Sequence, residues 1–370
     1  MVLYNKKAKI DYILLFSVIA LVIIGIVFVY SASYYTASSE LNNKYYYCIK
    51  QIIGAVVGFV FLTLACIVNL EKIKKLYIVL YVLSVILLCL VFVPHIGIEN
   101  YGAKRWIGFG SFSIQPSEIA KFAYVLFCAV YMSKSNTDMT KVKYNLPVIF
   151  CGILLCALII IEPNMSITIC IGATMLAVLF FGGIRVRNLV IILVPLLLCI
   201  PLLIVIEPYR LQRLLAFINP WASPKDEGYQ LIQSLYALGS GGWFGVGLFN
   251  SRQKYKFLPF AESDFVFSII GEEIGLIGCL FVMSLFVIVI LRGIKIAVSA
   301  ENKYKCYLSG GITAIIAVQS LINFAVVTGC IPPTGLPLPF VSYGGTSLVM
   351  FLTAVGALLN ISRSNNSTLI

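Results

Sequence analysis

Residues 257–278 read FLPFAESDFVFSIIGEEIGLIG, and this stretch turns a long polar loop into an apolar span. Asp264 stands at the junction, and Glu272 and Glu273 follow within the apolar run. On one continuous helix these glutamates lie about 12–14 Å further along, a depth at which ionisable groups mark functional sites. At about 100° per residue, Glu272 falls near the Asp264 face and Glu273 nearly opposite. The spacing predicts a site on one side of the helix and a packing contact on the other.

The composition around this stretch is that of an integral membrane protein. Of 370 residues, 60% are hydrophobic and only 11% are charged. Apolar runs of about 20 residues recur along the chain, which excludes a soluble domain and indicates a polytopic bundle. Lys6, Lys7 and Lys9 precede a first run that is too long for a signal peptide, so we expect it to remain as the first span.

Charge and cysteine content exclude several other classes. The net charge of +12 comes from 27 basic residues spread among loops, without the basic–aromatic motif of a nucleic-acid module, so no nucleic-acid partner is expected. Eleven cysteines fall almost all within apolar runs and lack CxxC spacing, as core residues do. A single histidine, His95, excludes a histidine metal cage, and no metal-binding residues are predicted.

The apolar runs predict an all-α integral membrane fold, a bundle of ten transmembrane helices in a single domain, 1–370. Lysine and arginine cluster in the short loops on the side of the N-terminus, so both termini are predicted to be cytoplasmic. The expected spans are about 11–31, 51–69, 76–94, 116–133, 146–161, 165–182, 188–206, 265–291, 306–328 and 346–361.

Three segments on the opposite side are longer or more patterned than plain connectors. Residues 95–115 are rich in glycine, and residues 329–345 are built from proline and glycine, which forbid a regular helix. Residues 207–264 form a loop of unusual length with apolar residues at helical spacing in 228–238. We expect a large ordered extracellular loop between spans seven and eight, which carries the candidate polar site.

Polar residues at the start of the fourth span form a second candidate site. A helix start is sufficient to explain Pro116 and Ser117, and the charge of Glu118 suits a helix N-terminus. Lys121 lies one turn deeper on the same face, where an ammonium group needs a carboxylate. Its predicted partner is Glu118 or, across helices, Asp264.

Basic residues on the outer side point to a phosphate-bearing ligand, although any single one has a solvated charge as its plain alternative. The predicted substrate-binding residues are Lys104, Arg105, Arg210, Arg213, Gln233, Lys254 and Ser342. Glycines at 239–242 suit either a backbone cradle for phosphate or a flexible loop. The turn at Glu162, Pro163 and Asn164 is explained by helix termination. These features favour an outward-facing polar site but leave enzyme and transporter open.

Four separated motifs resemble the SEDS family, named for shape, elongation, division and sporulation, with FtsW, RodA and SpoVE as members. They are RWIGFGSFSIQPSEIAK (105–121), GYQLIQSLYALGSGGWFGVGL (228–248), LPFAESDFVFSIIGEEIGLIG (258–278) and TGLPLPFVSYGGTSLV (334–349). YSAS at 30–33 and NSRQK at 250–254 are closer to the division and sporulation branch.

The resemblance implies a bacterial cytoplasmic-membrane peptidoglycan glycosyltransferase that polymerises lipid II. Implied partners are a class B penicillin-binding transpeptidase and other division or sporulation membrane proteins. The family's essential acid corresponds to Asp264, and its Glu and Lys in the QPSE helix correspond to Glu118 and Lys121. Many relatives have Pro-Glu at 259–260 and Pro-Asp at 163–164, where this chain has Pro-Phe and Pro-Asn.

The implied chemistry needs one carboxylate to take a proton from the acceptor 4-hydroxyl as it attacks the anomeric carbon. Basic side chains, or a divalent cation such as Mg²⁺ or Mn²⁺, offset the charge of the leaving pyrophosphate, and no other cofactor is expected. An α-linked donor and β-linked product imply inversion. The alternative is a lipid II flippase, for which no convincing inverted repeat or pair of broken helices is found. A scaffold that only recruits the transpeptidase leaves Asp264 and Lys121 unexplained.

Overall fold

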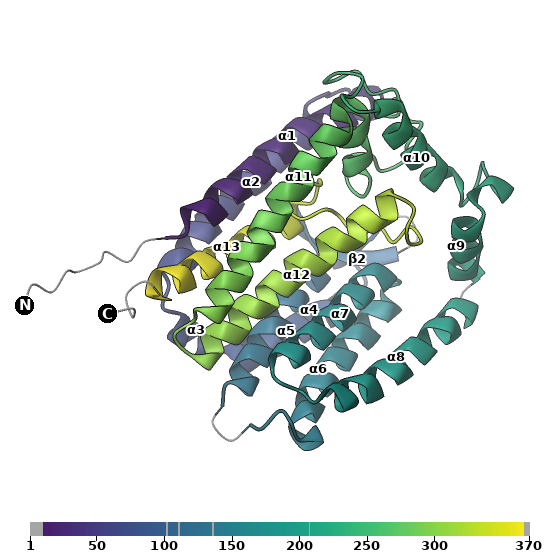
Figure 1. The fold of residues 1–370 in the computed structure, drawn as a ribbon. Coiled ribbons are helices and arrows are strands. Elements are labelled where there is room, and N and C mark those ends of the chain that lie inside the picture. The colour runs from purple at the N-terminus through teal and green to yellow at the C-terminus, as the bar shows by residue number, and fades with distance from the viewer. Residues whose placement is uncertain (1–9, 101–102, 110–111, 135–136, 207, 366–370) are drawn as a thin grey trace, which may run out of the picture.

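The computed structural model describes residues 10–100, 103–109, 112–134, 137–206 and 208–365, most of them in helices (Figure 1). The elements in chain order are α1 Tyr12–Leu41, α2 Tyr46–Ile67, α3 Leu70–Lys75, α4 Tyr77–Leu90, β1 Gly97–Asn100, β2 Ala103–Phe109, β3 Phe112–Ile114, α5 Pro116–Met132, α6 Val142–Ile161, α7 Met165–Phe181, α8 Val186–Ile206, α9 Pro208–Ile218, a 3-10 turn Pro220–Ala222, α10 Tyr229–Gly241, α11 Val266–Val298, α12 Lys303–Val327 and α13 Gly345–Asn365.

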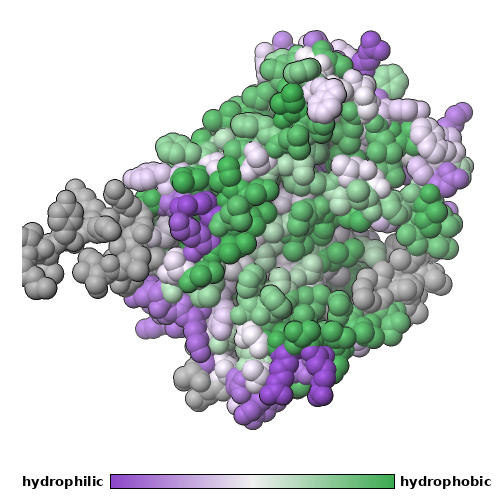
Figure 2. All heavy atoms as spheres, in the orientation of Figure 1, coloured by the Kyte–Doolittle hydropathy of each residue, from purple (hydrophilic) through white to green (hydrophobic). Residues whose placement is uncertain are grey.

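Within the described residues, six helices are long and apolar enough to cross a membrane: α1, α2, α6, α11, α12 and α13. Shorter apolar helices lie at Tyr77–Leu90, Met165–Phe181 and Val186–Pro195. Hydrophobic side chains cover most of the face drawn in Figure 2, and hydrophilic ones gather mainly at its margins. The chain is therefore a multi-pass membrane protein.

Small residues let the helices approach closely. A Cβ added to Gly356 of α13 would lie 2.3 Å from the Leu62 carbonyl oxygen of α2, and one added to Gly58 would lie 2.4 Å from Leu352. Lipid is as apolar as a leucine side chain, so helix association in membranes depends on such close contacts. α13 is thus held along α2.

The expected all-α fold is wrong at β1, β2 and β3, which form a three-stranded antiparallel sheet. Trp106, Ile107 and Phe109 favour extended structure. Ala103 and Ile107, at even spacing on β2, are buried while Lys104 is exposed, which is the alternation of a strand covered on one face. The sheet joins α4 to α5, and Thr346 Oγ1 of α13 accepts a hydrogen bond from the Gln115 amide at 3.3 Å.

α11 is two helices joined at Gly275, whose backbone has φ 68° and ψ −168°. Phe267 and Phe286 both contact the ring of Phe324, with centroid distances of 4.7 and 5.5 Å. In a straight helix these phenylalanines would lie about 28 Å apart along the axis. The halves before and after Gly275 therefore lie side by side, and the expectation of one uninterrupted span over 265–291 is wrong. Glu272 and Glu273 precede the break and lie on the first half, which begins at Val266.

The segment 242–247 closes the break in α11. Val246 and Gly247 donate their amides to the carbonyls of Glu272 and Glu273, at 2.9 and 3.0 Å. In return, the amides of Leu276 and Ile277 donate to the carbonyls of residues 242 and 243, at 2.9 and 3.2 Å. Each freed backbone group named here finds a partner, as an apolar surrounding requires.

The glycines near position 240 serve this contact. A Cβ on Gly241 would lie 1.9 Å from the Gly271 carbonyl oxygen, and one on Gly245 would lie 2.2 Å from that of Glu273. Gly239 and Gly241 belong to α10, so the flexible-loop interpretation is wrong there. Close backbone approach accounts for Gly241 and Gly245 without a bound phosphate.

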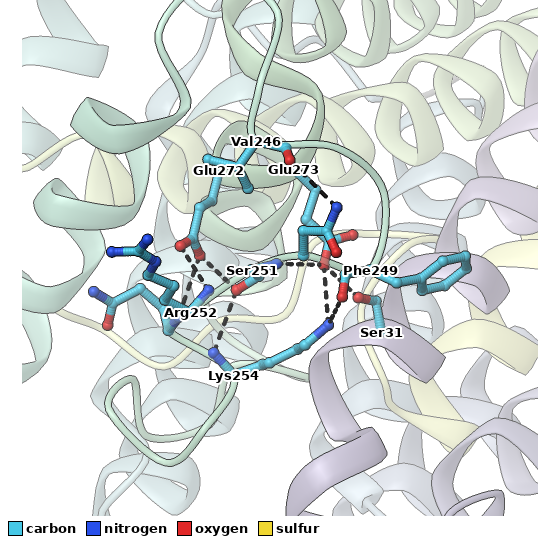
Figure 3. A network of polar contacts seen from close by, with 10 residues as sticks. Ser31, Val246, Phe249, Ser251, Arg252, Lys254, Glu272 and Glu273 are labelled. Atoms are coloured by element: carbon cyan, nitrogen blue, oxygen red, sulfur yellow. Dashed lines mark hydrogen bonds and ion pairs between the residues drawn. The ribbon is translucent and has the colours of Figure 1, made fainter.

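Glu272 and Glu273 both bind the segment 249–254 (Figure 3). The Glu272 carboxylate accepts hydrogen bonds from the Ser251 hydroxyl and from the amides of residues 252 and 253. Glu273 accepts from the Ser31 hydroxyl of α1 and from the Ser251 amide, and Lys254 Nζ lies 3.6 Å from it. Both glutamates thus bind one segment, and Glu273 in addition reaches α1 through Ser31.

Replacement of Gly275 by alanine tests the helix break. The backbone angles of Gly275 are nearly restricted to glycine, and an added Cβ would lie 2.4 Å from the Gly245 nitrogen. We expect Gly275→Ala to lose about 1–3 kcal/mol from backbone strain alone, measured as a lowered midpoint of thermal unfolding in detergent. Gly172→Ala is the control, since no atom lies within 4 Å of a Cβ built there. Equal midpoints for the two variants would refute the argument.

Candidate functional site

Three segments lie at one end of the bundle, hereafter the loop end: the described residues of 95–115, residues 208–265 and residues 329–344. The Tyr343 amide donates to the Glu262 carbonyl at 2.9 Å, and Arg213 Nη1 donates to the Pro333 carbonyl at 3.3 Å. Arg105 Nε donates to the Glu162 carbonyl at 3.3 Å. Elements distant in the sequence are thereby tied around one site.

Asp264 lies between the end of α12 and the proline-rich loop. Asn323 Nδ2 donates to the Asp264 carbonyl at 2.9 Å and to the Leu336 carbonyl at 2.7 Å. A Cβ built on Gly335 would lie 3.3 Å from Asp264 Oδ2, so a side chain at this position would crowd the carboxylate. The loop thus leaves room at Asp264, which keeps part of its surface exposed.

The protein surrounding Asp264 changes its acidity. Burial raises the pKa of Asp264 to about 6, against the charge of Arg213, a hydrogen bond from Ser263 and the charge of Arg105, which all lower it. Burial likewise raises the pKa of Glu262, and the charge of Asp264 adds to this rise. Asp264 is therefore ionised at neutral pH yet more basic than a free aspartate, which suits a general base.

Lys121 has Glu118 as its carboxylate partner, the first of the two expected. Its Nζ donates to Glu118 Oε1 at 2.9 Å and to Gln319 Oε1 at 2.6 Å, and both charged side chains are only 1% exposed. Gln319 Nε2 in turn donates to the Pro337 carbonyl at 2.9 Å. The pair is thereby connected to the loop that lies beside Asp264.

Glu162 was expected only to belong to a helix-terminating turn, but its side chain lies in the interior. Asn164 caps α7 by accepting from the Ile167 amide at 3.3 Å, as expected of a helix boundary. Glu162 itself is 0% exposed, and neither carboxyl oxygen has a hydrogen-bond partner among the described residues. Burial raises its pKa to about 8 against the charge of Arg105. The signal in the sequence was an acidic residue at the end of an apolar run.

Further buried polar atoms near this end lack a hydrogen-bond partner within the part of the chain that the structure describes. They include Ser117 Oγ, Glu118 Oε2, Asn323 Oδ1 and Thr334 Oγ1. Such groups are costly, and native proteins satisfy them with water or a ligand. Their number around the Asp264 loop indicates a wet or ligand-binding interior.

Arg105 and Arg213 are the predicted basic residues whose charges lower the pKa of Asp264. Arg213 also binds the carbonyl of Pro333, two residues before the Gly335 that faces the Asp264 carboxylate. Lys104 is exposed on β2, and Gln233 is partly buried on α10. The side chain of Arg210 lies outside the described part of the structure.

The other two predicted ligand residues have structural partners. Lys254 is only 4% exposed and joins the Glu273 network rather than the group around Asp264. Ser342 Oγ accepts from the Leu338 amide at 2.8 Å and so closes a turn. No group of three or more His, Cys, Asp or Glu side chains suited to a metal ion occurs in the described ranges.

Comparison with known proteins gives consistent matches over the whole chain. The cell cycle protein family model FTSW_RODA_SPOVE matches residues 12–367. Stage V sporulation protein E of Bacillus subtilis is 38% identical over 97% of this chain and 98% of its own. The probable peptidoglycan glycosyltransferase FtsW of Coxiella burnetii is 40% identical over 93% of this chain and 94% of its own.

Solved structures share the fold. One chain, from work on structural coordination of polymerization and crosslinking by a peptidoglycan synthase complex, has a TM-score of 0.80 at 26% identity. It covers 96% of this chain and 98% of that one. The rod shape determining protein RodA of Thermus thermophilus has a TM-score of 0.71 at 24% identity, with the same coverage, and supports the fold alone.

The buried Lys121–Glu118 pair predicts strong coupling between two substitutions. Lys121→Met leaves the Glu118 carboxylate uncompensated, a change that costs about 3–5 kcal/mol for buried pairs. We expect Glu118→Gln in the same chain to restore much of this loss, measured by thermal unfolding in detergent. Lys141→Met is the control, because its pair with Asp138 is exposed and contributes about 1 kcal/mol or less. Simple addition of the two single losses would disprove the coupling.

Proposed function

This chain belongs to the FtsW/RodA/SpoVE family of cell cycle proteins, and from that membership we propose that it is a peptidoglycan glycosyltransferase. Its substrate in this proposal is lipid II, which it polymerises into glycan strands. The observation that carries the proposal is Asp264, a carboxylate with a pKa near 6 beside two arginines at the loop end.

In the proposed reaction, the ionised Asp264 removes the proton from the acceptor 4-hydroxyl as the oxygen attacks the anomeric carbon. The bond from that carbon to the lipid pyrophosphate breaks, and the configuration inverts. Arg105 and Arg213 lie where positive charge can offset the departing pyrophosphate. Pyrophosphate leaves without protonation, so one carboxylate suffices where glycoside hydrolysis uses two.

In this scheme the positive charge that offsets the pyrophosphate comes from the two arginines, alone or together with a divalent cation. Should Mg²⁺ or Mn²⁺ contribute, Asp264 and Glu262 are the side chains that would hold it, since hard cations prefer oxygen ligands. Oxygens of the substrate phosphates would be the remaining ligands. The cation would then add positive charge at the leaving group.

The membrane arrangement in this proposal has ten spans, cytoplasmic termini and an extracellular loop 207–264 in the bacterial cytoplasmic membrane. The lysine and arginine distribution supports this orientation. The loop end would then face the outside, where strands are made.

The flippase remains the rival function. Transporters of the inverted-repeat type use paired broken helices whose open backbone groups bind the cargo. The backbone groups at the break in α11 are instead bonded to residues 242–247. The polar groups also gather at the loop end, and this placement favours the enzyme.

The proposed partners are a class B penicillin-binding transpeptidase and other division or sporulation membrane proteins. Support comes from the structural relative at 26% identity, which was studied in a peptidoglycan synthase complex that couples polymerization with crosslinking. Polymerised strands are the substrate that a crosslinking enzyme requires, so the two activities form a sequence.

Asp264→Asn tests the proposed function. The amide keeps the size of the side chain but cannot accept the proton, so we expect the rate to fall roughly 10²–10⁴-fold while the thermal midpoint is kept. The assay follows strand formation from lipid II by detergent-solubilised protein with its transpeptidase, where flipping has no meaning. Absence of strands with wild type, together with lipid II transfer across vesicles, would favour the flippase. Wild-type rates for Asp264→Asn would place the base elsewhere.

The charge of Arg213 predicts how the rate depends on pH. Asp264 must be ionised to act as base, so the rate should rise with pH through a midpoint near its pKa of about 6. Arg213 favours the ionised form, and Arg213→Gln should therefore raise the pKa and move the midpoint to higher pH. Lys225→Gln, an exposed change in the same loop, serves as the control and should leave the midpoint in place. An unmoved midpoint in Arg213→Gln would separate the arginine from the base.

A further inference from the structure

A cavity of about 710 Å³ lies apart from the residues around Asp264. One wall is the face of α10 that carries Tyr236 and Ser240, and the other is the segment with Asn250, Arg252 and Gln253. Glu272 also lines it.

The second wall is held rigidly by the network in Figure 3. Glu272 binds the Ser251 hydroxyl and the amides of residues 252 and 253, while Glu273 ties Ser251 to α1 through Ser31. A ligand would meet side chains on a fixed backbone and would not need to order this wall, which favours binding. The donors around Glu272 also offset its charge, so the cavity does not depend on a cation.

The free groups of the cavity suit a ligand with amides and a carboxylate. The Tyr236 side chain is 51% exposed, and its ring stands edge-on to Trp221 at a centroid distance of 5.8 Å. Gln253 Oε1 is buried and has no hydrogen-bond partner among the described residues, so it lacks a donor. Arg252 is exposed, and a guanidinium binds a carboxylate through two parallel hydrogen bonds.

α10 connects this cavity to the Asp264 site. Ser234 Oγ and Ser268 Oγ form a hydrogen bond of 2.8 Å, and Gln230 Nε2 donates to the Pro259 carbonyl at 3.3 Å. Ser240 lies six residues beyond Ser234, about 9 Å along the helix axis. Asp264 precedes Ser268 by four residues, so Asp264 and the cavity lie along the same contact between α10 and the first half of α11, within the reach of one extended ligand.

We propose that this cavity binds the carboxylate-bearing peptide that is attached to the sugars of the polymerised substrate. The proposal rests on the proposed function for the source of the ligand. Gln253 accepts a hydrogen bond from a peptide amide, Tyr236 packs against the backbone or side chain of the peptide, and Arg252 binds its carboxylate. The cavity thus lets the protein select peptide-bearing strands over bare sugar polymers.

Binding of a soluble disaccharide–peptide tests the proposal, because this probe lacks the lipid pyrophosphate and undergoes no reaction. We expect Arg252→Gln and Gln253→Ala each to raise its Kd about tenfold, as for a lost hydrogen bond to a charged group or a buried acceptor. Both variants keep the backbone amides that bind Glu272, so their thermal midpoints should match wild type. Lys225→Gln is the matched control for loss of a positive charge from this loop and should leave the Kd unchanged.

Two comparisons decide the ligand. Two further probes are the disaccharide without peptide and the disaccharide–peptide with its carboxylates amidated. For each of them, wild type and Arg252→Gln should have the same Kd. An equal effect of Arg252→Gln on all three probes would overturn the proposal. No binding of the peptide probe, together with binding of anionic phospholipid vesicles that Arg252→Gln weakens, would overturn it in favour of a lipid headgroup. Strand formation by wild type is measured in a separate assay. If wild type forms no strands but still binds the disaccharide–peptide, the result counts against the proposed function and not against the peptide site.

Discussion

A break in a helix within an apolar surrounding exposes backbone amides and carbonyls that have no water to bind. In this chain the break lies at Gly275, and the segment 242–247 supplies donors and acceptors on both sides of it. The close approach needs glycine at 241 and 245, which brings α10 against the first half of α11. Much of the loop-end architecture depends on this one set of backbone hydrogen bonds.

Buried charge is the second cost that the fold has to balance. Glu272 and Glu273 are held by hydroxyls, amides and Lys254, and Lys121 is held by Glu118 and Gln319. These networks also position loops: the first fixes residues 249–254, and the second reaches the proline-rich loop through the Pro337 carbonyl. Ionic groups inside the bundle thus serve the shape of the loop end as well as any chemistry there.

Asp264 and Glu162 have carboxyl groups whose burial is only partly compensated by nearby charges and hydrogen bonds. Burial raises the pKa of both carboxyl groups, and Arg105 opposes the rise at each of them. In the proposed mechanism, the partly exposed aspartate takes a proton from the substrate hydroxyl. A fully buried glutamate with no hydrogen-bond partner among the described residues has its charged form disfavoured, and its ionisation would be felt through the shared guanidinium.

Local sequence determined the membrane class, the approximate apolar segments and the Lys121–Glu118 pair, because hydropathy and i,i+3 spacing concern residues within a few positions of each other. The quoted motifs likewise identified the family. Tertiary structure alone decided the sheet at 97–114, the break at Gly275, the shared partners of Glu272 and Glu273, and the burial of Glu162. Glu273, for instance, binds Ser31, which lies 242 residues away. Periodicity along one helix contains no information about a partner that distant, and a glycine within an apolar run looks the same whether the helix continues or turns back.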